Sequence, residues 1–290
     1  MLGTVVGDMV GSVHEFRGTA TKTKEFGDLF VDNYVESKTE GVRFKLAIDG
    51  HGHRGAEASH FTDDTVCSMA VAKWLLEGRT DFSVVLREVC ARYPRCGYGG
   101  MFSKWVMDPN MKAYQSWGNG APMRVGPVGW AAISLEDADD LAMYTAEVTH
   151  NHSQAIKGAQ AVAEMIHLLR NKIDVDEALN IMLARLDSDG HYKSILNKTL
   201  DEIRPTYYFK VSSQDTVPQA LLCLKEAISF EDSIRNAISL GGDADTLAAI
   251  VGSMAEPYFG IPEWIAKEAL IRLNQEFRDI IVDFEKRFNP

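Results

Sequence analysis

Cysteine is scarce in this 290-residue sequence, and its four copies follow no recognisable spacing. Cys67, Cys90, Cys96 and Cys223 stand apart from one another in mostly apolar surroundings. A disulfide framework and a zinc site built on cysteine pairs are therefore excluded, since both need regularly spaced cysteines. We expect buried free thiols and a cytoplasmic location.

Long hydrophobic runs and an excess of basic charge are also missing. The longest apolar stretches, such as "LAAIVGSMA", fall far short of the about 20 residues that span a bilayer. The N-terminus "MLGTVVGDMVGS" lacks a basic region and carries Asp8, so it does not resemble a signal peptide. The formal net charge of −11 argues against a nucleic-acid-binding surface. We expect a protein that contacts neither membrane nor nucleic acid, and a monomer.

Helical periodicity is what the sequence has in quantity. Apolar residues recur at the spacing of one helix face from Cys67 to Leu75 and from Leu247 to Met254. Ser153 is expected to cap a further helix. Other helices are predicted at about 81–92, 137–149, 175–185, 216–228, 231–239 and 262–284. The sequence therefore predicts an all-α, compact fold, with residues 1–290 forming a single domain.

One segment, at about residues 29–60, shows no helical face. It is polar and rich in glycine, and its best candidate strand is the short stretch "VRFKLAI", Val42–Ile48. We expect a long loop that runs over the surface. The histidines His51, His53 and His60 allow a metal-binding interpretation, but a solvated loop is the favoured one.

The stretch "FTDDTVCSMAVAKW", residues 61–74, places two adjacent carboxylates before an apolar, helix-like run. Thr62 is a suitable N-cap, and acidic residues in a first helical turn are favoured by the helix dipole. Helix capping alone would thus explain Asp63 and Asp64. Side chains of a first turn tilt toward the helix N-terminus, however, so both carboxylates would project beyond the helix end.

A second stretch, "SLGGDADTLAAIVG", repeats this arrangement at residues 239–252, with Asp243, Asp245 and Thr246 before an apolar helix. If the two helix ends face each other, four carboxylates share a small volume. Two charges near 4 Å apart repel by about 4 kcal/mol at an effective dielectric constant of about 20. Only cations make this tolerable, and a set of oxygen ligands selects Mg²⁺ or Mn²⁺ over zinc. The sequence therefore predicts a site for two such ions.

A glycine-rich loop, "SWGNGAPMRVGPVGW", covers residues 116–130. Gly118 and Gly120 allow close approach to a phosphate, and residues from Ala121 onward can open a helix whose N-terminus favours anions. The lysine and hydroxyl of a Walker loop are absent. An ordinary turn is the alternative interpretation.

Five motifs together resemble the ADP-ribosylglycohydrolase family, which includes the dinitrogenase reductase-activating glycohydrolases. In chain order they are "GDMVGSVHEF", "FTDDT", "GNGAPMRVGPVGW", "EVTHNHSQAIKGAQAVA" and "SLGGDADTLAAIVGS". The resemblance covers nearly the whole chain. It implies an orthogonally packed, all-α domain with a dinuclear Mg²⁺ or Mn²⁺ centre. It also implies cleavage of the glycosidic bond between ADP-ribose and a modified side chain.

The resemblance assigns roles residue by residue. The implied metal ligands are Thr62, Asp63, Asp64, Asp243, Asp245 and Thr246. Glu15 matches a glutamate beside the metals and is a catalytic candidate, although a solvated glutamate at a helix end is the alternative. Asp64 is both a ligand and a candidate base. Asp8 is expected to support the site from behind or to pack between helices.

The substrate-binding residues implied by the resemblance are Ser116, Trp117, Gly118, Asn119, Gly120, Met123 and His150. Trp117 would stack on adenine or ribose, with a buried core tryptophan as the alternative. His150 would lie near the phosphates or the distal ribose, with a helix cap as the alternative. We favour His150 over His152 for this role.

The function that follows is a metal-dependent ADP-ribosylhydrolase that reverses mono-ADP-ribosylation, with arginine as the expected linkage. A hydrolase of a small ADP-ribose-like nucleotide and a non-catalytic ADP-ribose-binding relative are the alternatives. Loss of a metal ligand would favour the latter, and none is lost. Two features leave the modified target of the enzyme open. One is the long segment before Phe61, and the other is Asp215, at a position where glycine is commoner in relatives.

Overall fold

The computed structural model describes residues 1–15, 28–31 and 58–289, and helices account for all of the regular structure in these ranges. The helices are α1 (Leu2–Gly11), α2 (Asp63–Leu76), α3 (Phe82–Arg92), α4 (Gly100–Met107), α5 (Gly126–Ala131), α6 (Leu135–Glu147), α7 (Ser153–Arg170), α8 (Val175–Leu186), α9 (His191–Leu196), α10 (Leu200–Ile203), α11 (Ser213–Lys225), α12 (Phe230–Leu240), α13 (Ala244–Phe259), α14 (Glu263–Arg272) and α15 (Gln275–Phe288), with 3₁₀ turns η2 (Pro122–Arg124) and η3 (Arg204–Thr206). The prediction of an all-α fold is confirmed.

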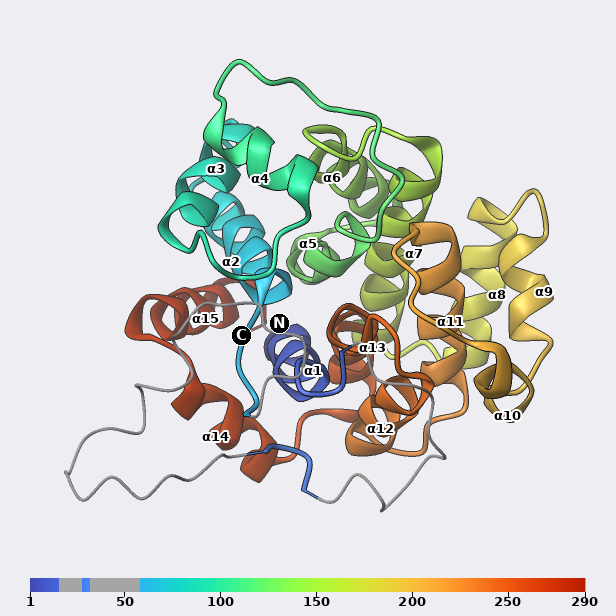
Figure 1. Ribbon diagram of the computed structural model, residues 1–290. Helices are drawn as coiled ribbons and strands as arrows, with labels where there is room; N and C mark the ends of the chain where they lie inside the picture. Colours follow the sequence, from blue (N-terminus) through green and yellow to red (C-terminus); the bar gives the residue numbers. More distant parts are fainter. Residues whose placement is uncertain (16–27, 32–57, 290) are drawn as a thin grey trace, which may run out of the picture.

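Helices α1 and α13 pack against each other at the centre of the molecule (Figure 1). Three glycines at helical spacing line the contact. A Cβ atom added to Gly3, Gly7 or Gly11 would lie 2.1, 1.9 or 2.4 Å from a backbone oxygen of α13. The two backbones therefore touch without side chains between them, and the antiparallel contact brings the C-terminal end of α1 to the N-terminal end of α13.

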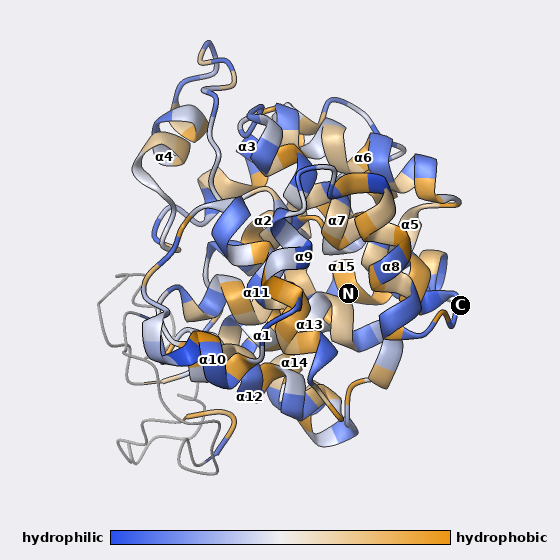
Figure 2. Ribbon diagram, turned by 90° about the vertical axis from the view of Figure 1, so that its right-hand side faces the viewer, coloured by the Kyte–Doolittle hydropathy of each residue, from blue (hydrophilic) through white to orange (hydrophobic). Residues whose placement is uncertain are grey.

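The remaining helices surround this pair. Helix α7 contacts α5, α6, α8, α11 and α13, while α2 packs against α3, α5 and α15. Hydrophobic segments gather around α11 and α13, and hydrophilic ones are prominent on α8, α10 and α12 (Figure 2). The buried apolar side chains form one continuous core, as the amphipathic periodicity requires.

Most predicted helices are present, because their starts carry suitable caps. Asp81, Asp174 and Ser229 each accept a hydrogen bond from a backbone N–H in the first turn of α3, α8 and α12. The helix predicted at 216–228 is α11. It begins about a turn earlier because Ser212 caps it, and it ends at Lys225. Helix α6 likewise starts two residues before its predicted position, after the cap Ser134.

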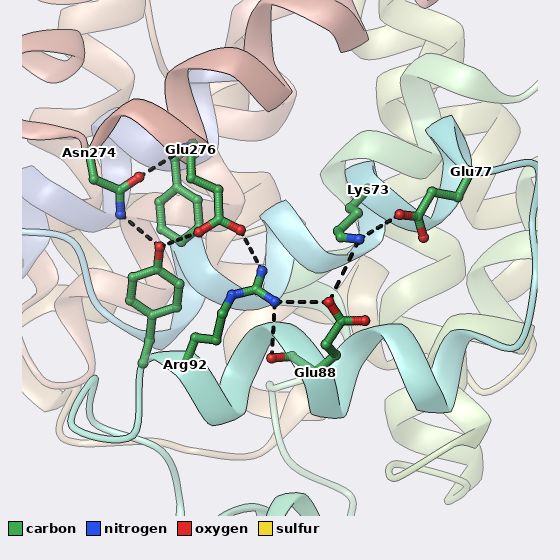
Figure 3. Close-up of polar contacts among 8 residues, drawn as sticks. Lys73, Glu77, Glu88, Arg92, Asn274 and Glu276 are labelled. Carbon is green, nitrogen blue, oxygen red and sulfur yellow. Dashed lines mark hydrogen bonds and ion pairs between the residues drawn. The ribbon is translucent and has the colours of Figure 1, made fainter.

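Two predictions about helix starts are wrong. The single helix expected at 262–284 is divided into α14 and α15, because the Asn274 side chain accepts the N–H of Phe277 and begins a new helix there. Its amide also donates to the Tyr93 hydroxyl at 2.9 Å, within a polar network that joins α15 to α3 (Figure 3). The cap of α7 is His152, whose Nδ1 accepts the N–H of Gln154, and Ser153 is the first helical residue.

The cysteines are free thiols, as expected, and Cys96 alone of the four is half-buried. No helix in the described ranges combines the length and the apolar character of a membrane span. The strand expected at 42–48, together with His51, His53 and most of the segment 29–60, lies outside the described residues. His60 is described, and its Nδ1 lies 3.0 Å from the carbonyl oxygen of Ala58.

A buried carboxyl group joins α6, α7 and α8. Glu164 accepts from Arg185 Nε at 2.6 Å, and Arg185 also donates to Asp139 at 2.7 Å and lies 3.7 Å from exposed Glu136. Burial, opposed by Arg185 and assisted by Asp139, raises the pKa of Glu164 to about 8. The folded chain thus retains a proton that the unfolded chain releases near pH 4.5.

We expect the free energy of unfolding to fall as the pH rises from about 5 toward 8, because the unfolded chain loses this proton first. The total loss of stability corresponds to about 1.4 kcal/mol for each unit by which the folded pKa exceeds the unfolded one. Glu164→Gln keeps the acceptor for Arg185 and has no proton to lose, so its stability should fall less. Urea unfolding at pH 5, 7 and 9 measures the difference, with Glu136→Gln as the control. Parallel pH profiles of Glu164→Gln and the wild type would contradict this.

Candidate metal centre

The structure brings the two acidic stretches together. The N-terminus of α2 and the N-terminus of α13 meet beside the end of α1, and the Thr246 hydroxyl lies 3.4 Å from Asp64 Oδ2. Thr62 Oγ1 lies 3.2 Å from the same carboxylate oxygen. Asp64 and Thr246, which are 182 positions apart in the chain, thus contribute to one cluster.

The side chains at these helix starts do not act as caps. Thr62 and Asp243 occupy the N-cap positions of α2 and α13, yet neither side chain accepts a capping hydrogen bond from a backbone N–H of its own helix. Thr62 Oγ1 instead donates to Asp8 Oδ1 at 2.7 Å, and Asp243 Oδ2 accepts from the Asn119 amide at 2.6 Å. Helix capping therefore does not explain either side chain.

Asp8 of α1 takes the capping role from a different helix. Its Oδ2 accepts the N–H groups of Thr62 and Thr65 at 2.8 and 3.0 Å, and the Thr65 hydroxyl at 2.5 Å. Asp8 is fully buried and holds the start of α2. The signal that marks it in the sequence is a carboxylate inside an otherwise apolar stretch, "VVGDMV".

The described part of the chain contains two groups of three carboxylates. Within each group, one oxygen atom of every residue lies within 4.8 Å of those of the other two. Asp8, Asp64 and Asp245 form the first group, and Glu15, Asp243 and Asp245 form the second. Asp245 belongs to both and links them. Asp8, expected only to support the site, thus has an oxygen among the possible ligands, an assignment that the sequence motifs do not make.

The cluster carries more negative charge than its surroundings balance. Burial, and then the neighbouring carboxylates, raise the pKa values of Asp63, Asp64 and Asp245 well above the usual range. The pKa of Glu15 is raised to about 7 by burial and by nearby Asp243. Asp64 Oδ1 is buried and finds no hydrogen-bond partner among the described residues. An orphaned buried oxygen among crowded carboxylates fits a hard divalent cation, which prefers oxygen ligands.

The remaining predicted ligands lie at the edge of the two groups. Thr246 contacts Asp64 through its hydroxyl, and its N–H donates to Asp245 Oδ1 at 2.9 Å. Asp63 is half-buried and belongs to neither group, but Asp8 and Asp243 are close enough to raise its pKa. A Cβ atom at Gly97 would lie 3.3 Å from its Oδ1.

The glycine loop is attached to this cluster through Asn119. The Asn119 amide donates to Asp243, and its backbone N–H donates to the carbonyl oxygen of Val211 at 2.9 Å. The N–H of Gly118 donates to Ser116 Oγ at 3.2 Å. These two N–H groups are therefore engaged within the protein and are not free to meet a phosphate.

Other loop residues differ in their exposure. Trp117 is 49% exposed, so its interpretation as a buried core tryptophan is wrong. Met123, expected to bind substrate, packs in the hydrophobic core, and its carbonyl oxygen accepts from Ser68 at 3.3 Å. The helix expected from Ala121 begins as the 3₁₀ turn η2 and continues as α5.

His150 lies under the glycine loop. A Cβ atom added to Gly120 would lie 2.7 Å from His150 Nε2, and one added to Gly118 would lie 3.6 Å away. Burial, with Arg124 nearby, lowers the pKa of His150 well below the usual value, so the ring is neutral. It caps no helix; that role belongs to His152.

Known proteins share this architecture. A family model described as ADP-ribosylglycohydrolase matches residues 1–288. ADP-ribosylarginine hydrolase Tri1 of Pseudomonas putida (strain GB-1) is 26% identical, over 96% of this chain and 76% of that protein. ADP-ribosylhydrolase ARH3 of Homo sapiens is 25% identical, over 91% of this chain and 85% of that protein.

A solved structure, named ADP-ribosylglycohydrolase-related protein complex, has the same fold. It superposes with a TM-score of 0.71 at 22% identity, over 98% of this chain and 93% of that chain. The family match spans nearly the whole sequence and confirms the resemblance that the five motifs carry. The chain therefore belongs to the ADP-ribosylglycohydrolase family and is a glycosidase-type hydrolase.

Proposed function

We propose that this protein is a divalent-metal-dependent hydrolase that removes ADP-ribose from modified arginine side chains of proteins. The observation that carries the proposal is the pair of carboxylate groups that share Asp245. The glycine loop supports it, because Asn119 ties that loop directly to Asp243. The arginine linkage is supported by the name of the Pseudomonas putida relative, an ADP-ribosylarginine hydrolase.

Two Mg²⁺ or Mn²⁺ ions would be held by side-chain oxygens from α1, from the turn that follows it, and from the N-terminal ends of α2 and α13. These would come from Asp8, Glu15, Thr62, Asp63, Asp64, Asp243, Asp245 and Thr246. When bound, the ions would neutralise the clustered charge, orient the ribose hydroxyls and activate a water. The protein would contribute a rigid arrangement of oxygens, since Asp8 fixes the start of α2 by four hydrogen bonds.

Glu15 is the group that we assign to proton transfer. It is half-buried, whereas Asp243 and Asp245 of the same group are buried, so Glu15 is the one that an incoming water or substrate reaches most directly. A carboxylate within hydrogen-bond reach of the attacking water would accept its proton. Asp64, with an unpartnered Oδ1, would serve as ligand or as the alternative base.

The proposal predicts release of free ADP-ribose from proteins modified on arginine, measured with Mg²⁺ or Mn²⁺ and, in parallel, with a chelator. Release should fall to the uncatalysed level when the metal is removed, because the ions that would orient the ribose hydroxyls and activate the water are then absent. Proteins modified on serine provide the comparison of linkages. Release from serine alone would contradict the arginine assignment. Absence of release from both, with metal bound, would favour hydrolysis of a small nucleotide or binding without catalysis.

A further inference from the structure

A fully buried arginine near His150 has no carboxylate partner in the part of the chain that the structure describes. Arg124 belongs to η2, and its Nη2 donates to the carbonyl oxygen of Thr145 at 2.6 Å and to Thr149 Oγ1 at 2.9 Å. Its Nε and Nη1 have no hydrogen-bond partner, and within the described ranges no carboxylate pairs with it. Leaving a charge buried on so few partners is costly, which suggests that its contact with Thr149 has a function.

The direction of each hydrogen bond follows from the chemistry of the groups. A guanidinium only donates, so Thr149 Oγ1 accepts from Arg124. The hydroxyl hydrogen of Thr149 then has one acceptor among its described contacts, His150 Nδ1 at 2.7 Å. If His150 Nδ1 carried the proton instead, both Arg124 and His150 would donate to Thr149 Oγ1, and the hydroxyl hydrogen of Thr149 would have no acceptor among its described contacts. Nδ1 is therefore the acceptor, and the proton of the neutral ring is on Nε2.

This Nε2–H faces the glycine loop. The distances to Cβ positions at Gly118 and Gly120 place Nε2 directly under the loop, and no described side chain or carbonyl oxygen accepts from it. The N–H groups of Gly118 and Asn119 are engaged elsewhere. His150 Nε2–H is thus a donor left available to a ligand at this loop.

We propose that Thr149, oriented by Arg124, is a positioning residue that fixes His150 in the tautomer with its proton on Nε2, so that a neutral N–H donor faces an anionic oxygen bound at the glycine loop. The identification of that oxygen with the diphosphate of ADP-ribose rests on the proposed function. The assignment of the His150 tautomer does not rest on the proposed function, because it follows from contacts within the protein. A neutral histidine donates one hydrogen bond and needs no protonation, so this donor persists at alkaline pH.

The test is a long-range ¹H–¹⁵N correlation spectrum of the histidine rings in the labelled full-length protein. His150→Gln identifies the His150 signals by their loss. In the wild type we expect an unprotonated Nδ1 and a protonated Nε2. Thr149→Val keeps the shape of the side chain and removes the hydroxyl, so the ring should shift to the other tautomer or to a mixture. Thr149→Ser should restore the wild-type pattern.

Calorimetric binding of ADP-ribose is the second readout. Loss of a correctly oriented donor to a charged group should weaken binding by about tenfold in Thr149→Val, with recovery in Thr149→Ser. Thr145→Val is the matched control, because this neighbouring buried threonine donates to Ala142 and does not touch His150. In Thr145→Val, the tautomer of His150 and the affinity for ADP-ribose should remain those of the wild type.

A wild-type ring protonated on Nδ1, or a tautomer unchanged in a folded Thr149→Val protein, would overturn the positioning role. If the tautomer responds as expected but ADP-ribose binds to no variant, the positioning role stands and the ligand assignment fails with the proposed function. The two proposals are thereby tested separately.

Discussion

Replacing Asp245 by asparagine will abolish tight divalent-cation binding and reduce ADP-ribose release by more than about 100-fold. Loss of a residue that only supports a metal ligand typically costs 10–100-fold in metal affinity or activity. Loss of a ligand shared by the two proposed ions should therefore cost more. Asp245 is the only residue among the described groups that contributes to both. Titration with Mn²⁺ by calorimetry and the rate of ADP-ribose release measure the two effects.

The stability of the same variant should change in the opposite direction. Without metal, Asp245→Asn removes one of several buried carboxylates that repel each other, so the metal-free variant should unfold at a higher temperature than the metal-free wild type. Added Mg²⁺ should raise the midpoint of the wild type and leave that of the variant unchanged. A variant that retains metal-dependent activity would show that the carboxylate cluster is not the metal centre.

Asp174→Asn is the matched control for both measurements. It makes the same chemical change at an N-cap outside the cluster, where asparagine caps as well as aspartate. Its metal affinity, rate and midpoint should remain those of the wild type. A comparable loss of activity in this control would show that the effect of Asp245→Asn is not local to the cluster.

Replacing Gly7 by alanine will separate α1 from α13 and destabilise the protein by about 3 kcal/mol or more, the upper end of what overpacking costs. The added Cβ atom would lie 1.9 Å from the carbonyl oxygen of Ala248 and 2.6 Å from the backbone nitrogen of Ala249. These are backbone atoms of a central helix, so no rotamer change relieves the clash. Urea unfolding monitored by circular dichroism measures the loss.

The same substitution should impair the proposed metal centre, although Gly7 supplies no ligand. Asp8 follows Gly7 directly and holds Thr62 and Thr65 at the start of α2, so a displaced α1 moves the first carboxylate group apart. Gly100→Ala is the control, because nothing lies within 4 Å of its added Cβ and alanine suits the first turn of α4. A Gly7→Ala protein with unchanged stability and Mn²⁺ affinity would contradict the close helix contact.

Local patterns in the sequence are sufficient for most of the longer helices and for the two acidic stretches, whereas the short helices α4, α9 and α10 are not among the predicted ranges. Apolar spacing and caps such as Asp81 and Ser229 depend on residues within one or two turns, so they can be recognised without knowing the fold. The break between α14 and α15 is not evident from the periodicity, because apolar residues continue across Asn274, and the local cap that Asn274 forms with the N–H of Phe277 is the signal that marks it. The pattern places the N-cap of α7 at Ser153, one residue late, because a histidine nitrogen, rather than a hydroxyl, accepts the N–H of Gln154.

The sequence by itself determined the all-α class, the family and the residue types of the candidate centre, because each is written in contiguous motifs. Only the tertiary structure decided which of these side chains meet. The glycine-lined contact of α1 with α13 places Asp8 beside Asp64 and Asp245, and Arg124 reaches Thr149 from a different element. Such juxtapositions depend on how closely two backbones approach, and that distance follows from packing between helices that are remote in sequence.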